Sequence, residues 1–499
     1  MNLKKVMMIL TRALVVIVLI CGLLISAVSF AKEKPKFTVV IRMMDIQDKW
    51  FRSNIIEPFE KEYNVDINVA VFDKMWDVPK LLELDAQKDK PTINLVKTPK
   101  EIMLYLKKKD LIQPYDDIVP AHELKTAKAD YDETALEVLG ILDGKLYFIP
   151  RKLETRMTIY LKSKVKDVRE NWIKLQAEIN ETLKVDNGYG LPAGYTLETD
   201  PNQWDLYDLF VVSYYWAYTP YFGMKMPRMA HRGKKYMGTV TGLADKAVEM
   251  GATQEDLLKL DSIPLVDMFQ WEAIFRKNGL YNSGMWEEAW SGGGIWGALR
   301  DGKVFLAFMH QIDCFFIHGG THPMMAGYLA EPDDLGAAVM PLGVSFDLDK
   351  NGKSLRTGNR KAETGGWGWG VPKNAPYPEL AWKLARYITN YQNHLAECQT
   401  FGMFPIREDI VTAIKKVFPI AWMSEVFEIS VKQARLNAGF TAPIIVQWTD
   451  VGKVYLDAWY DLIVDKGYES TLKPGKVDKS KITSVLKLKY APRVNEILK

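Results

Sequence analysis

The sequence predicts an α/β protein built around a parallel or mixed sheet. Apolar strand-like runs alternate with amphipathic helical segments near the N-terminus, and the alternation returns in the second half of the chain. Of the 499 residues, 48% are hydrophobic. This composition supports two or three core-forming domains and excludes a disordered or fibrous polymer.

The predicted elements follow from hydrophobic periodicity. The first half of the chain supplies strands at Phe37–Met43, Val65–Val71 and Ile93–Val96, a helix with Phe51, Ile55 and Phe59 on one face, and a helix at Ile102–Leu111. The second half supplies strands at Val304–Met309 and Leu335–Met340 and a helix that begins at Pro378. Between Tyr207 and Tyr281 the chain is mainly helical, with a basic loop at His231–Lys235 interpreted as a solvated turn.

Residues 1–31 have the pattern of a secretory signal. Lys4 and Lys5 precede the apolar run Ala13–Phe30, and Ser29-Phe30-Ala31 places small residues where a signal peptidase cleaves. The alternative is an uncleaved membrane anchor, because the run approaches the length of a bilayer span. We expect an exported, periplasmic or extracellular protein.

Charge argues against two classes of partner. The chain has 65 Lys and Arg against 62 Asp and Glu, and the three excess positive charges all lie within residues 1–31. The neutral remainder has no electrostatic reason to bind nucleic acid or an anionic membrane surface.

Cys314 and Cys398 follow the N-terminal stretch and do not form a disulfide framework; the sequence leaves open whether they pair or stay free thiols.

The sequence contains partial matches to cofactor and metal-binding motifs, but the residues around them do not fit such sites. The glycines of a GxGxxG match, Gly292, Gly294 and Gly297, follow a helical stretch instead of a strand, which favours a turn over a dinucleotide site. His310, Cys314, His318 and His322 recur every four residues, but Gly319-Gly320 interrupts the helix that would align them. We therefore expect no catalytic residues, cofactor or metal.

Aromatic residues are the positive signal, with 15 Trp, 23 Tyr and 20 Phe. Trp367 and Trp369 lie in the run Gly365–Gly370, where glycines permit close approach and leave few side chains for an indole to pack on. An aromatic face suits the C–H face of a sugar ring. Further candidates beside polar or small residues are Trp76, Trp204 and Trp296.

Four segments in order resemble the extracellular solute-binding proteins of ABC importers that capture sugars and oligosaccharides. They are GKLYFIP at 144–150 with its following ETR and IYLK, FRKNGL at 275–280 with LRDGKVFLAF at 299–308, GGWGWGVPKN at 365–374, and GMFPIRED at 402–409. Order and spacing match over about residues 36–415.

The resemblance implies a two-lobed, Venus-flytrap fold whose chain crosses the hinge more than once, and a monomer that delivers a small carbohydrate to a membrane permease. Lobe one would comprise 32–150 and 366–412, and lobe two 151–365 and 413–499. The cleft positions would be Asp45, Thr98, Arg156, His310, Gln311, Asp313 and Trp367, with Arg156 and Asp313 binding hydroxyls and Trp367 stacking on the sugar.

Two departures leave other functions open. Residues 224–264 have the character of an insertion, and Met309–His322 lacks the small, polar composition expected there. The same fold with a metal chelate, polyamine or peptide as ligand is one alternative. A secreted polysaccharide hydrolase is another, which would need two carboxylates about 5–9.5 Å apart.

Overall fold

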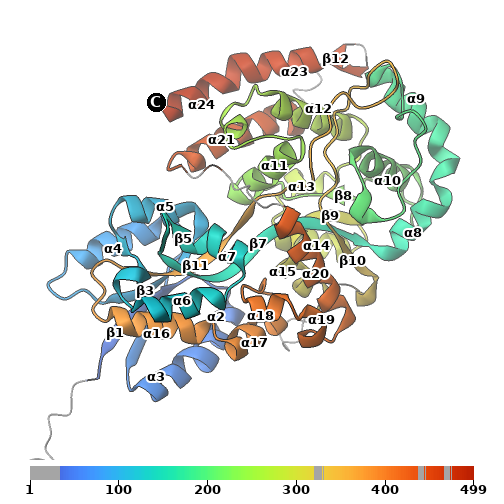
Figure 1. Ribbon diagram of the computed structural model, residues 1–499. Helices are drawn as coiled ribbons and strands as arrows, with labels where there is room; N and C mark the ends of the chain where they lie inside the picture. The colour runs from blue at the N-terminus through green and yellow to red at the C-terminus, as the bar shows by residue number, and fades with distance from the viewer. Residues whose placement is uncertain are drawn as a thin grey trace, which may run out of the picture.

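A computed structural model describes residues 34–319, 331–436, 445–465 and 475–499, together with residues 327, 329, 443, 472 and 473. It has two lobes connected through one sheet (Figure 1). In the described part of the chain this sheet has nine strands, ordered β2-β1-β3-β11-β7-β9-β8, with β4 beside β11 and β10 beside β7. The expected N-terminal signal lies outside the described residues.

Lobe one contains the parallel strands β1, β2 and β3, with β11 antiparallel to β3. Its strands are β1 (Lys36–Ile41), β2 (Asp66–Val71), β3 (Ile93–Pro99), β4 (Ile112–Gln113) and β11 (Thr364–Pro372). Its helices are α2 (Asp45–Phe51), α3 (Glu57–Tyr63), α4 (Asp77–Ala86), α5 (Lys100–Lys108), α6 (Ala121–Ala129), α7 (Glu133–Ala135), α16 (Pro378–Ile388), α17 (Tyr391–Phe401) and α18 (Glu408–Val411). These elements confirm the predicted α/β alternation.

Lobe two is mainly helical around the far end of the sheet. Its strands are β8 (Met229–Ala230), β9 (Leu306–His310) and β10 (Leu335–Ala338). Its helices are α8 (Lys162–Asn171), α9 (Gln176–Asn187), α10 (Leu206–Tyr218), α11 (Met237–Glu249), α12 (Ile263–Lys277), α13 (Gly284–Glu287), α14 (Gly292–Arg300), α15 (Gln311–His318), α20 (Ala421–Leu436), α21 (Trp448–Trp459), α23 (Lys479–Val485) and α24 (Ala491–Leu498). The predicted strands at 304–309 and 335–340 correspond to β9 and β10.

The two lobes share strand β7 (Phe148–Leu161). Its first half pairs with β11 from Phe148 to Thr155, and its second half pairs with β9 from Arg156 onward. The lobe boundary expected at residue 150 therefore falls inside a continuous strand. The chain passes between the lobes again before β11 and once more between α19 (Ile414–Val417) and α20 (Figure 1).

The glycine-rich run of β11 reflects close packing between strands. A Cβ on Gly370 would lie 2.5 Å from Cε1 of Phe148, and one on Gly366 would lie 2.2 Å from the carbonyl oxygen of Lys152. Gly366 also has a φ of +144°, a conformation that favours glycine. The register between β11 and β7 shifts between Trp367 and Gly368, which face Lys152 and Pro150, so Arg151 is the extra residue of a bulge in β7.

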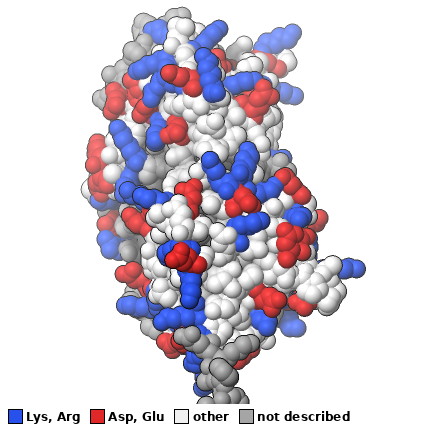
Figure 2. All heavy atoms as spheres, turned by 90° about the vertical axis from the view of Figure 1, so that its left-hand side faces the viewer, with Lys and Arg blue, Asp and Glu red and all other residues white. Residues whose placement is uncertain are grey.

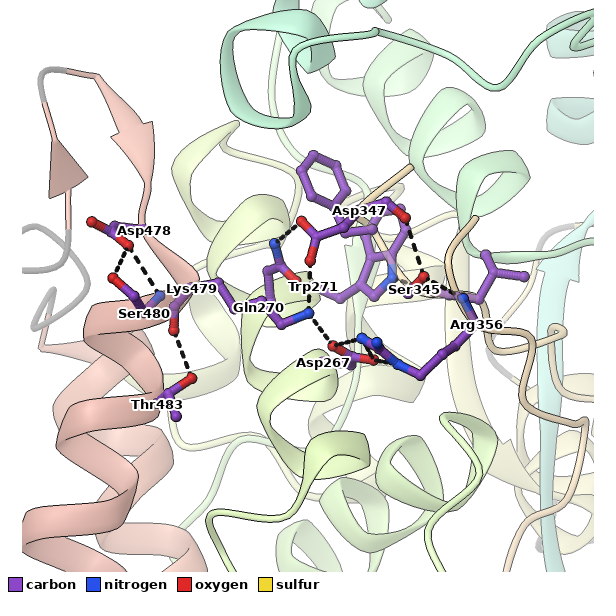
Figure 3. Close-up of polar contacts among 12 residues, drawn as sticks. Asp267, Gln270, Trp271, Ser345, Asp347, Arg356, Asp478, Lys479, Ser480 and Thr483 are labelled. Atoms are coloured by element: carbon purple, nitrogen blue, oxygen red, sulfur yellow. Dashed lines mark hydrogen bonds and ion pairs between the residues drawn. The ribbon is translucent and has the colours of Figure 1, made fainter. Parts of the chain in front are cut away.

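The C-terminal segment is fastened to lobe two by buried charge. Lys479 at the start of α23 reaches Asp267 of α12 at 2.5 Å and Asp347 at 2.7 Å (Figure 3). Asp267 also accepts hydrogen bonds from Nε and Nη2 of Arg356, and Gln270 donates to Asp347 at 2.9 Å. One lysine thus joins the C-terminal helices to α12 and to the loop before β11.

The surface agrees with the near-neutral composition. On the face shown in Figure 2, Lys and Arg alternate with Asp and Glu and do not gather into a patch of one sign. Within the described ranges no helix is both long and apolar enough to cross a membrane.

Candidate ligand site between the lobes

The strand ends of lobe one and the start of α15 in lobe two bring charged and aromatic side chains together between the lobes. The lobe-one side consists of Lys97, Lys152, Glu154 and Trp367, and the lobe-two side of Arg232 and Asp313; we call these six residues the interlobe cluster. Burial alone would raise the Glu154 pKa, but Lys152, Lys97 and Arg232 lower it. Groups from both lobes therefore act on one carboxylate.

The lobe-one side is built on β3, β7 and β11. Lys97 at the end of β3 is buried, donates to the carbonyl oxygen of Arg42, and holds its ammonium 4.3 Å from the centroid of the Trp367 ring. Lys152 on β7 forms an ion pair with Glu154 two residues along the strand. Trp367 is half-buried, so part of its ring stays accessible beside these charges.

The lobe-two side is organised by Asp313 in the first turn of α15. Its carboxylate accepts hydrogen bonds from the backbone N–H of His310 at 3.0 Å, from Nε1 of Trp296 at 3.0 Å and from Arg232 at 3.2 Å. Trp296 in turn stacks on Phe316, with ring centroids 4.6 Å apart and planes 10° apart. These contacts fix a carboxylate and a half-buried indole in one orientation.

His310 is a neutral group at this site. Burial lowers its pKa well below the usual range, with Arg232, Arg156 and Lys152 acting in the same direction. Its Nδ1 lies 3.4 Å from Arg232. The imidazole therefore offers hydrogen bonding without charge.

A small pocket lies beside the cluster where α4 and α5 approach α21. Residues of both lobes line it: Trp76, Lys100, Glu101, Glu363, Pro443, Ile445, Trp448 and Thr449. Nε1 of Trp76 donates to Oγ1 of Thr449 at 3.4 Å across the lobes. The cavity measures about 20 Å³, room for about one water, so the lobes are closed on each other here. Burial lowers the pKa of Lys100 to about 8.

The structure corrects the predicted role of two tryptophans. Trp369 is fully buried in lobe one and stacks on Phe51 with planes 13° apart. It lies two residues further inside the sheet than Trp367, which pairs with Pro99 at the very end of β3. Trp204 is buried in lobe two, where its Nε1 donates to the carbonyl oxygen of Glu198 at 2.9 Å. Both indoles are packed within a single lobe and present no face to the space between the lobes.

Arg156 also differs from its expected role. Its guanidinium forms a buried ion pair with Asp245 and donates to Thr241 at 2.5 Å and to the carbonyl oxygen of Gly238 at 3.1 Å. These groups all belong to lobe two, so the structure uses Arg156 to anchor α11 instead of leaving its donors for a hydroxyl.

The other predicted positions lie at strand and helix ends. Asp45 is exposed at the start of α2. Thr98 and Gln311 are fully buried, and neither the Thr98 hydroxyl nor the Gln311 amide has a hydrogen-bond partner among the described residues. Unpaired buried polar groups are costly, so these two side chains call for a water or ligand partner.

Sequence reasoning missed several residues of the site. Arg232 lies in the loop interpreted as a solvated turn, but it is half-buried against Asp313 while its neighbour His231 is buried. Lys152 and Glu154 lie two residues apart on β7, a spacing that places both side chains on one face of a strand. Trp448 and Thr449 had no local signal, since they reach the site from α21, far along the chain.

The candidate metal ligands remain dispersed. Among the described residues no group of three or more His, Cys, Asp or Glu side chains is placed to hold a metal ion; His322 lies outside the described residues. Cys314 and Cys398 are both buried free thiols, which answers the question that the sequence left open.

Most of the chain is similar to a known protein family. Residues 54–419 match the family described as bacterial extracellular solute-binding protein. A search of curated proteins found no match.

Three similar solved structures cover nearly the whole chain. Maltose-bound MalE3 of T. maritima is 15% identical, with 93% of this chain and 99% of that chain covered and a TM-score of 0.62. An ABC transporter solute-binding protein of Thermotoga lettingae with α-D-tagatose is 16% identical, with 93% and 100% covered and a TM-score of 0.62. The GacH receptor of Streptomyces glaucescens, solved without ligand and with acarbose, is 12% identical, with 93% and 100% covered and a TM-score of 0.62. These likenesses establish a shared two-lobed fold.

Proposed function

This chain belongs to the bacterial extracellular solute-binding proteins, and from that premise we propose that it binds a saccharide between its lobes and delivers it to an ABC permease. The observation that carries the saccharide assignment is the combination of half-buried indoles and fixed polar groups at the interlobe cluster. Trp367 and Trp296 supply apolar faces, and Asp313 is held by three donors. Sugar rings need both kinds of partner.

Two buried polar side chains support the same proposal. The amide of Gln311 and the hydroxyl of Thr98 lack partners among the described residues. A sugar hydroxyl both donates and accepts, so it satisfies either group. Solved relatives in this fold hold maltose, tagatose and acarbose, which agrees with a polyhydroxylated ligand.

The transport role requires that ligand change the arrangement of the lobes. A ligand that contacts both lobes stabilises the closed form, and a permease that binds this form better receives loaded protein preferentially. We place the protein outside the cytoplasmic membrane, with residues 1–31 as its export signal or its anchor.

A non-catalytic role fits the carboxylates of the cluster. Glu154 is paired with Lys152 and Asp313 with Arg232, and the pKa of Glu154 is lowered, whereas a general acid requires a raised pKa. The hydrolase alternative therefore ranks below transport.

A thermal-shift screen of the purified protein tests the proposal. A ligand that binds only the folded state stabilises it by about 2.7 kcal/mol at a hundredfold excess over Kd. Mono- and oligosaccharides form the main panel, with polyamines, peptides and divalent metals as controls. We expect a shift with one saccharide class and its loss in Trp367→Ala.

Trp286→Ala provides a matched control. This half-buried tryptophan of α13 carries the Arg276 guanidinium 4.7 Å from its ring centroid, as Trp367 carries Lys97, but it is outside the interlobe cluster. The control should retain the shift. An increase in Tm only with metals, polyamines or peptides would refute the saccharide assignment. Release of sugars from a panel of glycans would instead favour the hydrolase alternative.

A further inference from the structure

The buried cations around the interlobe cluster are paired one to one with carboxylates. Each pair joins a strand or loop residue to a buried or half-buried acid. The four pairs are Arg151–Glu397, Lys152–Glu154, Arg156–Asp245 and Arg232–Asp313. Such pairing is the usual condition for burying charge in a protein interior.

Lys97 is the exception. It is 3% exposed, yet no carboxylate among the described residues lies within 4.0 Å of its ammonium, whose contacts are the Arg42 carbonyl oxygen and the Trp367 ring. The charges that act on it most strongly are the cations Arg151 and Lys152. Lys100 is also buried and has no carboxylate within 4.0 Å of its ammonium in the described part of the chain, but it differs from Lys97 because its charged neighbours are the acids Glu363 and Glu101.

We infer that the ligand is an acidic saccharide whose carboxylate pairs with Lys97 while its ring lies against Trp367. This inference rests on the proposed function and specifies the class of sugar. Lys97 is a buried cation with no carboxylate partner among the described residues and with cations as its strongest charged neighbours, and one ligand carboxylate supplies the missing charge. A phosphate monoester would also be attracted, but as a dianion it would bring a second charge for which the cluster holds no unpaired cation.

Pairing with a carboxylate also changes the protonation of Lys97. In the unliganded protein burial lowers the Lys97 pKa well below its usual range, and Arg151 and Lys152 lower it further, against the weaker opposing effects of Glu397 and Glu154. A bound carboxylate favours the ammonium form. Binding is therefore accompanied by proton uptake at pH values above the unliganded pKa.

Titration calorimetry on the purified protein tests this. The probes are di- and trisaccharides of galacturonate and of glucuronate, with the methyl esters of the same sugars as uncharged controls and maltotetraose as a neutral oligosaccharide. We expect one acidic sugar to bind at least about 30-fold more tightly than its ester. Its apparent binding heat should change between two buffers of different ionisation enthalpy, which reports the proton.

Lys97→Met should remove both the preference for the acid and the buffer dependence. Because this variant replaces an unpaired buried cation by an apolar chain, it should melt no lower than wild type. Lys383→Met is the matched control, since Lys383 also holds its ammonium near a ring, 5.8 Å from the centroid of Tyr63, on an exposed face of α16. The control should bind like wild type.

The other possible binding results separate the inference from the proposed function. Binding of maltotetraose or of the esters as tight as that of the acids overturns the inference and leaves the saccharide function standing. An acid preference that persists in Lys97→Met overturns the role of Lys97. If no saccharide binds, the proposed function itself fails.

Discussion

Two tryptophans separated by one glycine are expected to have opposite roles, and mutation separates them. Trp369 is fully buried and stacked on Phe51, with ring centroids 5.8 Å apart, and its Nε1 has no hydrogen-bond partner among the described residues. Replacing a buried tryptophan by alanine costs about 3–5 kcal/mol. Removing the unpaired indole N–H returns about 1 kcal/mol of that cost, so Trp369→Ala should destabilise the protein by about 2–4 kcal/mol.

The assay is denaturation of Trp369→Ala, Trp369→Phe and Trp367→Ala beside wild type. At about 2.1 cal/mol/K per residue, the loss for Trp369→Ala corresponds to a Tm decrease of about 2–4 °C. Trp369→Phe keeps a ring on Phe51 without the orphan donor and should stay within about 1 kcal/mol of wild type. Trp367→Ala loses a cation–π contact of about 0.5–1 kcal/mol and should lose saccharide binding as well.

Equal stability losses in Trp369→Ala and Trp367→Ala would refute this reasoning. So would a Trp369→Ala protein that keeps wild-type stability but no longer binds, because Trp369 would then act as a ligand-facing indole and not as a core one.

Two other predictions concern stability. Lys479→Met removes the ammonium shared by Asp267 and Asp347 (Figure 3) and should lower the free energy of unfolding by about 1–2 kcal/mol in urea denaturation. The control Lys487→Met, exposed on the same C-terminal segment, should have no measurable effect, and equal effects of the two variants would contradict a stabilising role of the Lys479 ion pairs. Burial, with Arg407 and Arg151 nearby, lowers the pKa of His394 to about 3. Between pH 6.5 and pH 3 the imidazole is therefore protonated in the unfolded chain but neutral in the folded protein, so the folded protein loses stability as the pH falls. Wild type should therefore lose about 3 kcal/mol more than His394→Gln between pH 7 and pH 4, and parallel pH profiles would contradict the assignment.

Local periodicity was sufficient for most of the fold. The run at 37–43 became β1, because consecutive apolar residues suit a strand with a neighbour on each edge, and β1 pairs with both β2 and β3. The helix predicted from Pro378 became α16 for the same local reason. Strand β7 escaped prediction as one element, because its charged residues interrupt the apolar pattern and are buried only through partners far along the chain.

The candidate site was predictable only where a residue stood in a local motif. Trp367 was found through its glycines, but the motif could not distinguish it from Trp369, since the burial of each indole depends on how far it lies inside the paired strands β3, β11 and β7. Arg232 was misread because its carboxylate partner, Asp313, follows eighty-one positions later. No sequence pattern pointed to Lys97, because a buried lysine can be recognised as lacking a carboxylate partner only when the positions of the surrounding charged side chains are known.

Strand β7, which the two lobes share, determines whether backbone hydrogen bonds break when the lobes open or close. The β11 ladder on β7 ends at Thr155, and the β9 ladder begins at Arg156. Neither neighbouring strand continues past the junction, so rotating one lobe against the other bends β7 and the two other crossing segments without separating any strand pair. Opening and closing therefore leave the backbone ladders of both lobes whole, and the energy difference between the two forms is set by the side chains and the ligand that meet between them.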